Sequence, residues 1–374
     1  MPTRKRIHIN KSAKHSTRPK YHPKEWVIWW KSLKRFQKFF IFLIAFSVLY
    51  LSQAYALAYW YQQKHKNEPL NLGVTFIANY ADYLGVDPHQ TLLALRDDLH
   101  FKRFRLVSYW EDIEKTPGVY DFSELDWEMN QISAVNGSVS LAIGLRQPRW
   151  PECHMPSWTT NEPYSVWYPQ LNKFMTAVIK RYKNNPSLVS YQLENEYYLS
   201  AFAKCPNSTR ARINEEFEMV KALDNKTPVI ISLSNNYFGI PITSPRPNQY
   251  GVSVYKLVWD RTITHNYFEY PFPDWYYSWR AAMTEIVTGK SSMLHELQAE
   301  PWPPKGILNS SQEELKKSMN PTLLQSRINY GEKTGFRDID LWGGEYWYYE
   351  KTKFSDSGLW NVVKEAVRDS RQQK

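Results

Sequence analysis

The stretch Tyr191-Gln192-Leu193-Glu194-Asn195-Glu196-Tyr197 carries two glutamates directly after an apolar run that is typical of a buried strand. Later in the chain, Met293-Leu294-His295-Glu296 repeats this arrangement of an apolar run that ends in a glutamate. Hydrolysis of a glycosidic bond needs two carboxyl groups: one protonates the leaving oxygen, and the other attacks the sugar or activates water. The two stretches therefore predict a catalytic pair, provided that both strands belong to one sheet.

Apolar, β-prone runs alternate with helical stretches from residue 71 to residue 370, which favours a parallel sheet covered on both faces. Eight such units predict a closed (β/α)8 TIM barrel, a fold of about 250 residues. An open doubly wound sheet is the alternative, but it usually carries a G-x-G-x-x-G turn, which this chain lacks. The expected strands are Leu70–Phe76, Phe104–Tyr109, Val139–Leu145, Leu188–Leu193, Pro228–Leu233, Gly251–Val254, Ser292–His295 and Asp338–Trp342.

A basic segment and then an apolar segment precede the expected barrel. Residues 1–38 hold twelve lysines and arginines against one acid, Glu25, whereas the whole chain has a net charge of +10. Residues 39–61 contain no charged side chain and are long enough to cross a bilayer, which takes about 20 apolar residues. We therefore expect a basic cytoplasmic tail (1–38), a single transmembrane signal-anchor in the lipid bilayer (39–61), a polar linker (62–70) and an exported catalytic domain (71–370).

A cleaved signal peptide is the alternative interpretation of the apolar segment. Residues 39–51 would be its hydrophobic region and Ala54-Tyr55-Ala56 its cleavage site, so that the protein would be secreted. In both cases the chain after residue 61 lies outside the cytoplasm, where we expect no nucleic-acid partner and where disulfides form. Cys153 and Cys205 follow two successive strands on the same face of the sheet, so an intrachain disulfide and two free thiols are both open.

The pattern at residues 191–197 resembles the "Q-x-(D/E)-N-E-Y" signature of clan A glycoside hydrolases, especially families 35 and 42, and the barrel as a whole resembles family 5. The resemblance implies that Glu196 is the general acid/base and that Asn195 binds the 2-hydroxyl of the sugar. An acid held in a partly apolar pocket has a raised pKa, which suits this role. Glu194 is the alternative acid, because strand alternation also allows its side chain to point inward.

The seventh strand resembles the place where this clan carries its nucleophile, which implies that role for Glu296. Glu300 has the same strand parity and is the alternative nucleophile. Residues 105–122 resemble the clan's "R-x-x-x-x-W-x-x-(I/L)-E-x-x-x-G-x-Y-D-F" motif, which implies that Arg105 lies beside the nucleophile and keeps it ionised. Tyr255, after the sixth strand, resembles a tyrosine that contacts the nucleophile in this clan.

Aromatic residues make up 16% of the chain, and many lie in loops expected at the carboxyl ends of the strands. Aromatic faces stack on the apolar faces of pyranose rings. Trp342 or Trp347, near the eighth strand, resembles the tryptophan on which the sugar stacks in this clan, and Trp110 is a further candidate for substrate binding. The other aromatic residues of these loops are Trp150, Trp158, Tyr197, Tyr198, Trp259 and Trp302.

Other chemistries lack their motifs in this sequence. A zinc-binding H-E-x-x-H after His295 would need a histidine at Ala299, and no G-x-S-x-G is present. The histidines show no metal-ligand spacing, so neither a metal nor a cofactor is expected. We expect a membrane-anchored retaining glycoside hydrolase that cleaves a β-linked oligo- or polysaccharide by double displacement. A transglycosylase that remodels envelope glycans and an inactive carbohydrate-binding surface protein are the alternatives.

Overall fold

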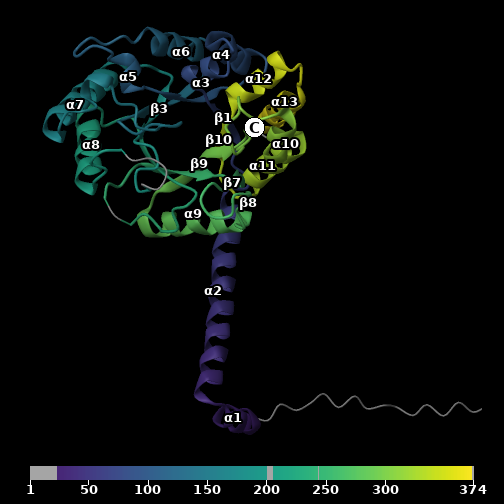
Figure 1. Ribbon diagram of the computed structural model, residues 1–374. Helices are drawn as coiled ribbons and strands as arrows, with labels where there is room; N and C mark the ends of the chain where they lie inside the picture. The colour runs from purple at the N-terminus through teal and green to yellow at the C-terminus, as the bar shows by residue number, and fades with distance from the viewer. Residues whose placement is uncertain (1–22, 200–204, 243, 373–374) are drawn as a thin grey trace, which may run out of the picture. The chain divides into compact units, whose positions relative to one another are not determined.

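Eight parallel strands close into a barrel in the spatial order β1-β10-β9-β6-β5-β4-β3-β2 (Figure 1). The computed structural model describes residues 23–199, 205–242 and 244–372. The strands are almost continuously buried, as expected for a sheet that helices cover on the outside. The predicted (β/α)8 barrel is therefore confirmed. Its strands are β1 (Asn71–Thr75), β2 (Arg103–Val107), β3 (Ser138–Ile143), β4 (Leu188–Leu193), β5 (Val229–Leu233), β6 (Gln249–Val254), β9 (Ser291–Gln298) and β10 (Asp338–Trp342).

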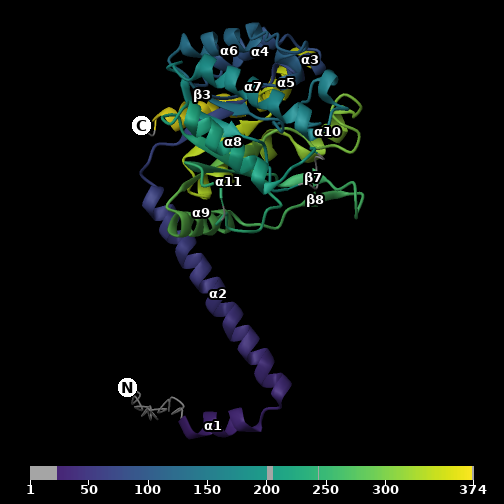
Figure 2. The ribbon, with the colours of Figure 1, turned by 90° about the vertical axis from the view of Figure 1, so that its left-hand side faces the viewer.

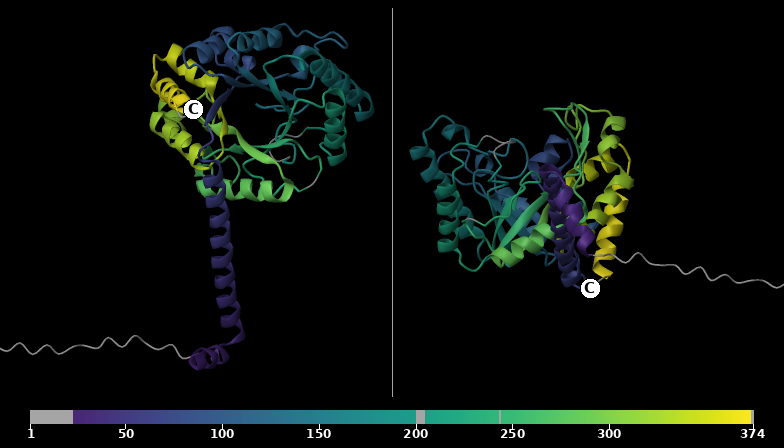
Figure 3. Two further views of the ribbon diagram at one scale, coloured as in Figure 1. Left: turned by 180° about the vertical axis from the view of Figure 1, so that it is seen from behind. Right: turned by 90° about the horizontal axis from the view of Figure 1, so that it is seen from below.

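Helices surround the strands on the outside of the barrel, as Figure 3 shows from two further sides. Two of them begin at the sequence signals that are typical of a helix start. The side chains of Asp87 and Asn320 accept hydrogen bonds from backbone N–H groups of the first turn, and each precedes a proline. The helices of this layer are α3 (Ala78–Tyr83), α4 (Pro88–Asp97), α5 (Trp110–Ile113), α6 (Ser123–Ser133), α7 (Tyr164–Tyr182), α8 (Arg210–Leu223), α9 (Asp274–Thr288), α10 (Gln312–Ser318), α11 (Pro321–Lys333), α12 (Gly344–Lys353) and α13 (Gly358–Gln372).

The loop after β6 carries an antiparallel hairpin that was not predicted from the sequence. Strands β7 (Leu257–Trp259) and β8 (Tyr267–Glu269) pair with each other and not with the barrel. Figure 2 shows them next to α10, and the hydroxyl of Tyr267 donates a hydrogen bond of 2.8 Å to Glu314 of that helix. Strands of three residues without a glycine turn between them give no clear pattern, so the hairpin could not be predicted.

The N-terminal region contains two helices, α1 (Pro23–Ser32) and α2 (Arg35–His65). Helix α2 is 31 residues long, about 46 Å, and apolar enough to cross a bilayer. The prediction of a linker over residues 62–70 is wrong in its first half, because residues 62–65 continue the helix. The polar composition of that half is explained by the contacts described next.

The C-terminal turns of α2 belong to the same compact unit as the barrel, which begins at Ala54. Ala54, Ala58 and Tyr61 lie on one face of the helix and are buried. The Gln62 amide donates hydrogen bonds of 2.9 Å to the Ser278 hydroxyl of α9 and 2.8 Å to a main-chain oxygen at the end of α11. The apolar segment that is exposed all round is therefore shorter than the predicted span, because its last two turns pack against protein.

Replacing Ala58 with aspartate should destabilise the barrel, because Ala58 is fully buried and a charge there would have no partner. We expect the free energy of unfolding to fall by about 3 kcal/mol. Tyr59→Asp is the matched control, since Tyr59 is the next residue of the same helix but is 54% exposed. Thermal unfolding of the detergent-solubilised protein measures both changes, and equal effects would contradict the packing described above.

Candidate active site

Glu196 and Glu296 come together at one end of the barrel because both lie at the carboxyl ends of parallel strands. Glu296 lies within β9, which extends to Gln298 and is longer than predicted. Glu196 follows β4 in a tight turn, in which Glu194 and Glu196 have positive φ angles of 53° and 43°. Such backbone conformations are uncommon for residues with a side chain and are concentrated at functional sites. Glu196 and Glu296 are both more than nine-tenths buried.

Both oxygens of the Glu296 carboxylate accept short hydrogen bonds. The Arg105 guanidinium donates through Nη1 to Oε1 over 2.7 Å, and the Tyr255 hydroxyl donates to Oε2 over 2.7 Å. Arg105 is fully buried, so this ion pair is formed away from solvent. Arg105, expected from the motif at residues 105–122, and Tyr255, expected after the sixth strand, thus both contact the Glu296 carboxylate. These two hydrogen bonds hold the carboxylate in one orientation.

Asn195 is fixed by the same arginine. Its side-chain oxygen accepts hydrogen bonds from Arg105 Nη2 over 3.0 Å and from Gln192 Nε2 over 2.9 Å. Gln192 in turn accepts a hydrogen bond of 2.7 Å from Arg105 Nε. The side-chain oxygen is thus occupied, and the amide nitrogen of Asn195 is the group that can donate to a ligand.

Glu196 lies in an environment that favours its protonated form. Burial, followed by the negative charges of Glu296 and Glu152, raises the pKa of Glu196 to about 8. The Ser253 hydroxyl and the Arg146 guanidinium act in the opposite direction but do not cancel this effect. The surroundings of Glu196 thus differ from those of Glu296, which is paired with Arg105, and acid/base chemistry requires such a difference between two carboxyl groups.

Glu194, the alternative acid, has a structural role in the loop after β3. Its carboxylate accepts hydrogen bonds from the backbone N–H groups of Leu145 and Arg146, over 2.8 and 3.0 Å, and pairs with Arg212 over 3.1 Å. Gly144 allows this approach: it has a φ angle of 107°, and a Cβ atom there would lie 2.6 Å from Glu194 Oε1. The Glu194 carboxylate is therefore occupied by contacts with the loop after β3 and with α8.

Glu300, the alternative nucleophile, belongs to a separate group of side chains. It accepts hydrogen bonds of 2.7 Å from Arg149 Nη1 and 2.8 Å from Trp342 Nε1. The Arg149 guanidinium lies between the rings of Tyr80 and Trp342, 3.4 and 4.3 Å from their centroids. One face of Trp342 is therefore covered by Arg149 in this structure, although the residue lies at the carboxyl end of β10 as predicted.

Two tryptophans that were expected to bind substrate lie in the core instead. Trp347 is fully buried, and its indole N–H donates a hydrogen bond of 2.7 Å to the main-chain oxygen of Ala299. Trp110 is also fully buried, and its indole N–H donates to Glu114 over 2.6 Å. The predictions for both residues are wrong, because their rings complete the packing between barrel and helices and have no surface left for a sugar.

The intrachain disulfide is present between Cys153 and Cys205. It connects the loop after β3 with the loop after β4, across 52 residues of sequence. Cys205 lies in the loop that follows Glu196, so the disulfide ties this loop to the loop after β3. In the described residues, no group of three or more His, Cys, Asp or Glu side chains is arranged to hold a metal ion.

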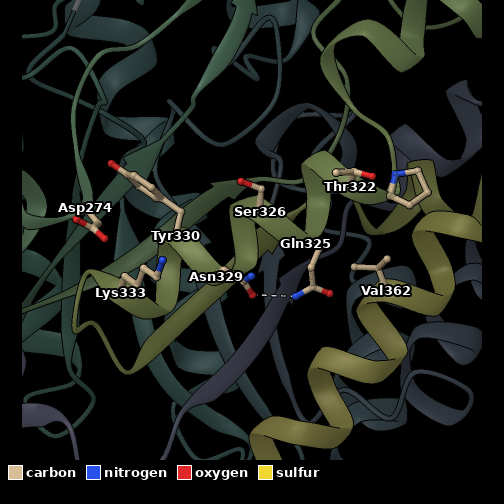
Figure 4. Close-up of a pocket in the computed structure, with 9 residues that line it drawn as sticks. Asp274, Thr322, Gln325, Ser326, Asn329, Tyr330, Lys333 and Val362 are labelled. Carbon is tan, nitrogen blue, oxygen red and sulfur yellow. Dashed lines mark hydrogen bonds between the residues drawn. The ribbon is translucent and has the colours of Figure 1, made fainter. Parts of the chain in front are cut away.

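A surface groove lies on the outside of the barrel, away from the glutamates. Residues of α9, α11 and α13 line it, among them Asp274, Tyr330 and Val362 (Figure 4). Gln325 and Asn329 hydrogen bond to each other along α11 over 2.9 Å at its centre. None of the residues that surround Glu196 or Glu296 contributes to this groove.

No protein-family model matches the chain, and no curated protein matches its sequence. Solved structures match its fold. A GH5_18 protein from Bifidobacterium longum subsp. infantis matches with a TM-score of 0.57 at 11% identity, over 80% of this chain and 79% of that protein. A β-galactosidase from the haloarchaeon Halorubrum lacusprofundi matches with a TM-score of 0.54 at 12% identity, over 81% and 58%.

The exo-β-1,4-mannosidase Op5Man5 from Opitutaceae bacterium strain TAV5 matches with a TM-score of 0.53 at 14% identity, over 81% of this chain and 60% of that protein. The chain thus spans about three fifths of the length of the β-galactosidase and the mannosidase. The three matches show that the chain has the (β/α)8 barrel fold of these proteins.

Proposed function

We propose that the protein is a retaining glycoside hydrolase that acts on a β-linked glycan. The observation that carries this proposal is a pair of buried glutamates at one end of the barrel, of which one is held by Arg105 and Tyr255 and the other is not. Glu296 is bound by Arg105 and Tyr255, whereas burial and neighbouring negative charge favour the acid form of Glu196. Double displacement needs one carboxylate that attacks the sugar and one carboxylic acid that protonates the leaving oxygen.

The reaction uses the two carboxyl groups in sequence. Glu196 gives its proton to the glycosidic oxygen while a carboxylate oxygen of Glu296 attacks the anomeric carbon, and the bond between that carbon and the leaving oxygen breaks. Glu196, now ionised, then takes a proton from water, which attacks the anomeric carbon and releases the sugar from Glu296 with retained configuration. Asn195, whose oxygen is held by Arg105 and Gln192, offers its amide nitrogen to the hydroxyl next to the reacting carbon.

The proposal includes a location outside the cytoplasm. The basic tail would stay inside and α2 would cross the bilayer, since it is long and apolar enough to do so. The Cys153–Cys205 disulfide supports an oxidising compartment. Sedimentation with membranes, and release by detergent but not by high salt, is the expected behaviour. Release by salt alone, or a mature N-terminus near Ala56, would contradict the anchor.

Hydrolysis by the full-length, detergent-solubilised protein tests the activity itself. We would measure release of the aryl group from a panel of aryl β-glycosides, and of reducing sugar from β-glucan, mannan and galactan polymers. Turnover of one class that is lost in both Glu196→Gln and Glu296→Gln would support the proposal. Product analysis at high acceptor concentration distinguishes hydrolysis from transglycosylation, in which a sugar hydroxyl takes the place of water. Binding of a glycan without turnover would favour the inactive carbohydrate-binding protein.

The activity should decline in alkaline solution because Glu196 must carry a proton for the first step. Its pKa is about 8, so the protonated fraction falls as the pH rises through that value. We expect kcat/KM to fall tenfold per pH unit above about pH 8, as for a single acid whose protonated form is the active one. A profile that stays flat to pH 10 for substrates with poor leaving groups would contradict the assignment of Glu196.

A further inference from the structure

The fully buried guanidinium of Arg146 connects the turn that carries Glu196 with a third acid, Glu152. Arg146 Nε donates to Glu152 Oε2 over 2.5 Å. Arg146 Nη1 donates to the main-chain oxygens of Glu196, over 2.9 Å, and Leu199, over 2.6 Å. The side chain of Arg146 thus contacts both the backbone of the catalytic acid and a carboxylate that plays no part in double displacement.

Backbone contacts and the disulfide fix Glu152 relative to Glu196. The main-chain N–H of Asn195 donates to the main-chain oxygen of Arg146 over 2.6 Å. The main-chain N–H of Gln147 donates to the main-chain oxygen of Glu152 over 2.8 Å. Cys153, the residue after Glu152, forms the disulfide with the loop that follows Glu196. Glu152 is therefore connected to the Glu196 turn by main-chain hydrogen bonds as well as by the Arg146 side chain.

Glu152 lies at the edge of the site, where its side chain remains partly accessible to solvent. Its side chain is 15% exposed, whereas that of Glu296 is 5% exposed. Burial raises the pKa of Glu152, the Arg146 guanidinium lowers it, and the negative charge of Glu296 raises it. Glu152 is thus close enough to the catalytic carboxyls to interact with both of them.

We propose that Glu152 is a positioning residue that neutralises Arg146 and thereby prevents the buried positive charge of Arg146 from acting on the Glu196 carboxyl. The inference rests on the proposed function. Without Glu152, the buried positive charge of Arg146 would lie at the Glu196 turn with no counter-ion. That charge would stabilise the Glu196 carboxylate, so the acid would lose its proton at a lower pH.

The other groups that face Glu196 do not replace this effect. Glu296 also favours the protonated form, and more strongly than Glu152, but it pairs with Arg105 and does not neutralise Arg146. The remaining groups are neutral or oppose protonation. The groups around the Glu196 carboxyl are Glu296 from β9, Glu152 and Arg146 from the loop after β3, Ser253 from β6 and Tyr255 from the loop after β6.

The test is the pH dependence of kcat/KM for Glu152→Gln on the substrate found in the panel. We expect the alkaline limit to move down by about 0.5–1.5 pH units, while kcat on the acid side of the profile changes by less than about threefold. Glu152→Asp, which restores the charge, should move the limit back toward that of the wild type. Glu111→Gln is the matched control, because Glu111 pairs with His154 of the same loop and should leave the limit unchanged.

An unchanged or raised alkaline limit in Glu152→Gln would overturn the proposal, as would an equal shift in Glu111→Gln. If Glu152→Gln does not fold, the intermediate shift expected of Glu152→Asp remains decisive.

A second measurement needs no turnover and separates this inference from the proposed function. The difference in stability between wild type and Glu196→Gln depends on pH up to the pKa of Glu196. In a Glu152→Gln background this dependence should end at a lower pH. If the pH at which this dependence ends does not move in the Glu152→Gln background, the inference is refuted even if the enzyme is active. If that pH moves down but the protein is inactive, only the proposed function is wrong.

Discussion

Replacing Glu296 with glutamine should lower kcat on every substrate by a factor on the order of 10⁴ or more, because the attacking carboxylate is removed. The glutamine side-chain oxygen can still accept the hydrogen bond that Arg105 now donates to Glu296 over 2.7 Å, so the site should keep its shape. Steady-state hydrolysis of an aryl β-glycoside measures the loss, and circular dichroism together with the melting temperature checks the fold.

Glu300→Gln is the matched control for this substitution. Both glutamates pair with a largely or fully buried arginine, Arg105 for Glu296 and Arg149 for Glu300, over 2.7 Å in each case. Each variant therefore leaves an arginine without its counter-charge, and both should lose a similar amount of stability. Only Glu296→Gln should lose turnover. If Glu300→Gln were the inactive variant and Glu296→Gln the active one, the nucleophile would be Glu300.

The sequence was sufficient to locate the eight strands of the barrel. Apolar runs in a parallel barrel are buried on both faces, so they are continuous and easy to recognise. The bounds of β4 and β10 agree with those predicted. Once the strands are placed, parallel topology alone brings Glu196, Glu296 and Arg105 to one end of the barrel.

The sequence did not distinguish tryptophans of the core from tryptophans that bind substrate. Trp110, Trp342 and Trp347 follow strand ends in the sequence, yet the first and last are fully buried. The same ring is favoured in a core and on a sugar-binding surface, since both need a large apolar face. Only the packing of neighbouring helices decides which environment a given tryptophan meets.

Contacts between residues of different loops could not be predicted from the sequence either. Arg146 and Glu196 are 50 residues apart, and neither Arg146 nor Glu152 belongs to a recognisable motif. Similarly, the i, i+4 spacing of Ala54 and Ala58 fits a membrane helix as well as a helix packed on protein. The structure distinguishes the two, because this face of α2 is buried in the barrel unit.

Replacing Glu196 with alanine should affect substrates according to their leaving groups. A sugar or alkoxide leaving group needs the proton of Glu196, so its release should slow by about 10²–10⁴-fold. A dinitrophenyl leaving group departs without a proton, and its release should be nearly unchanged. The second step then lacks its general base, so a glycosyl-enzyme on Glu296 should accumulate and appear as a burst of dinitrophenol in stopped-flow measurements.

Azide provides the stereochemical test of this variant. A small anion that enters the space left by Glu196 needs no general base, so it should restore turnover and yield the β-glycosyl azide from a β-glycoside. In Glu296→Ala the same anion would attack the opposite side of the sugar and yield the α-glycosyl azide. The two products have opposite configurations because Glu196 and Glu296 act on opposite faces of the anomeric carbon. The same anomer from both variants would therefore rule out double displacement between these two residues.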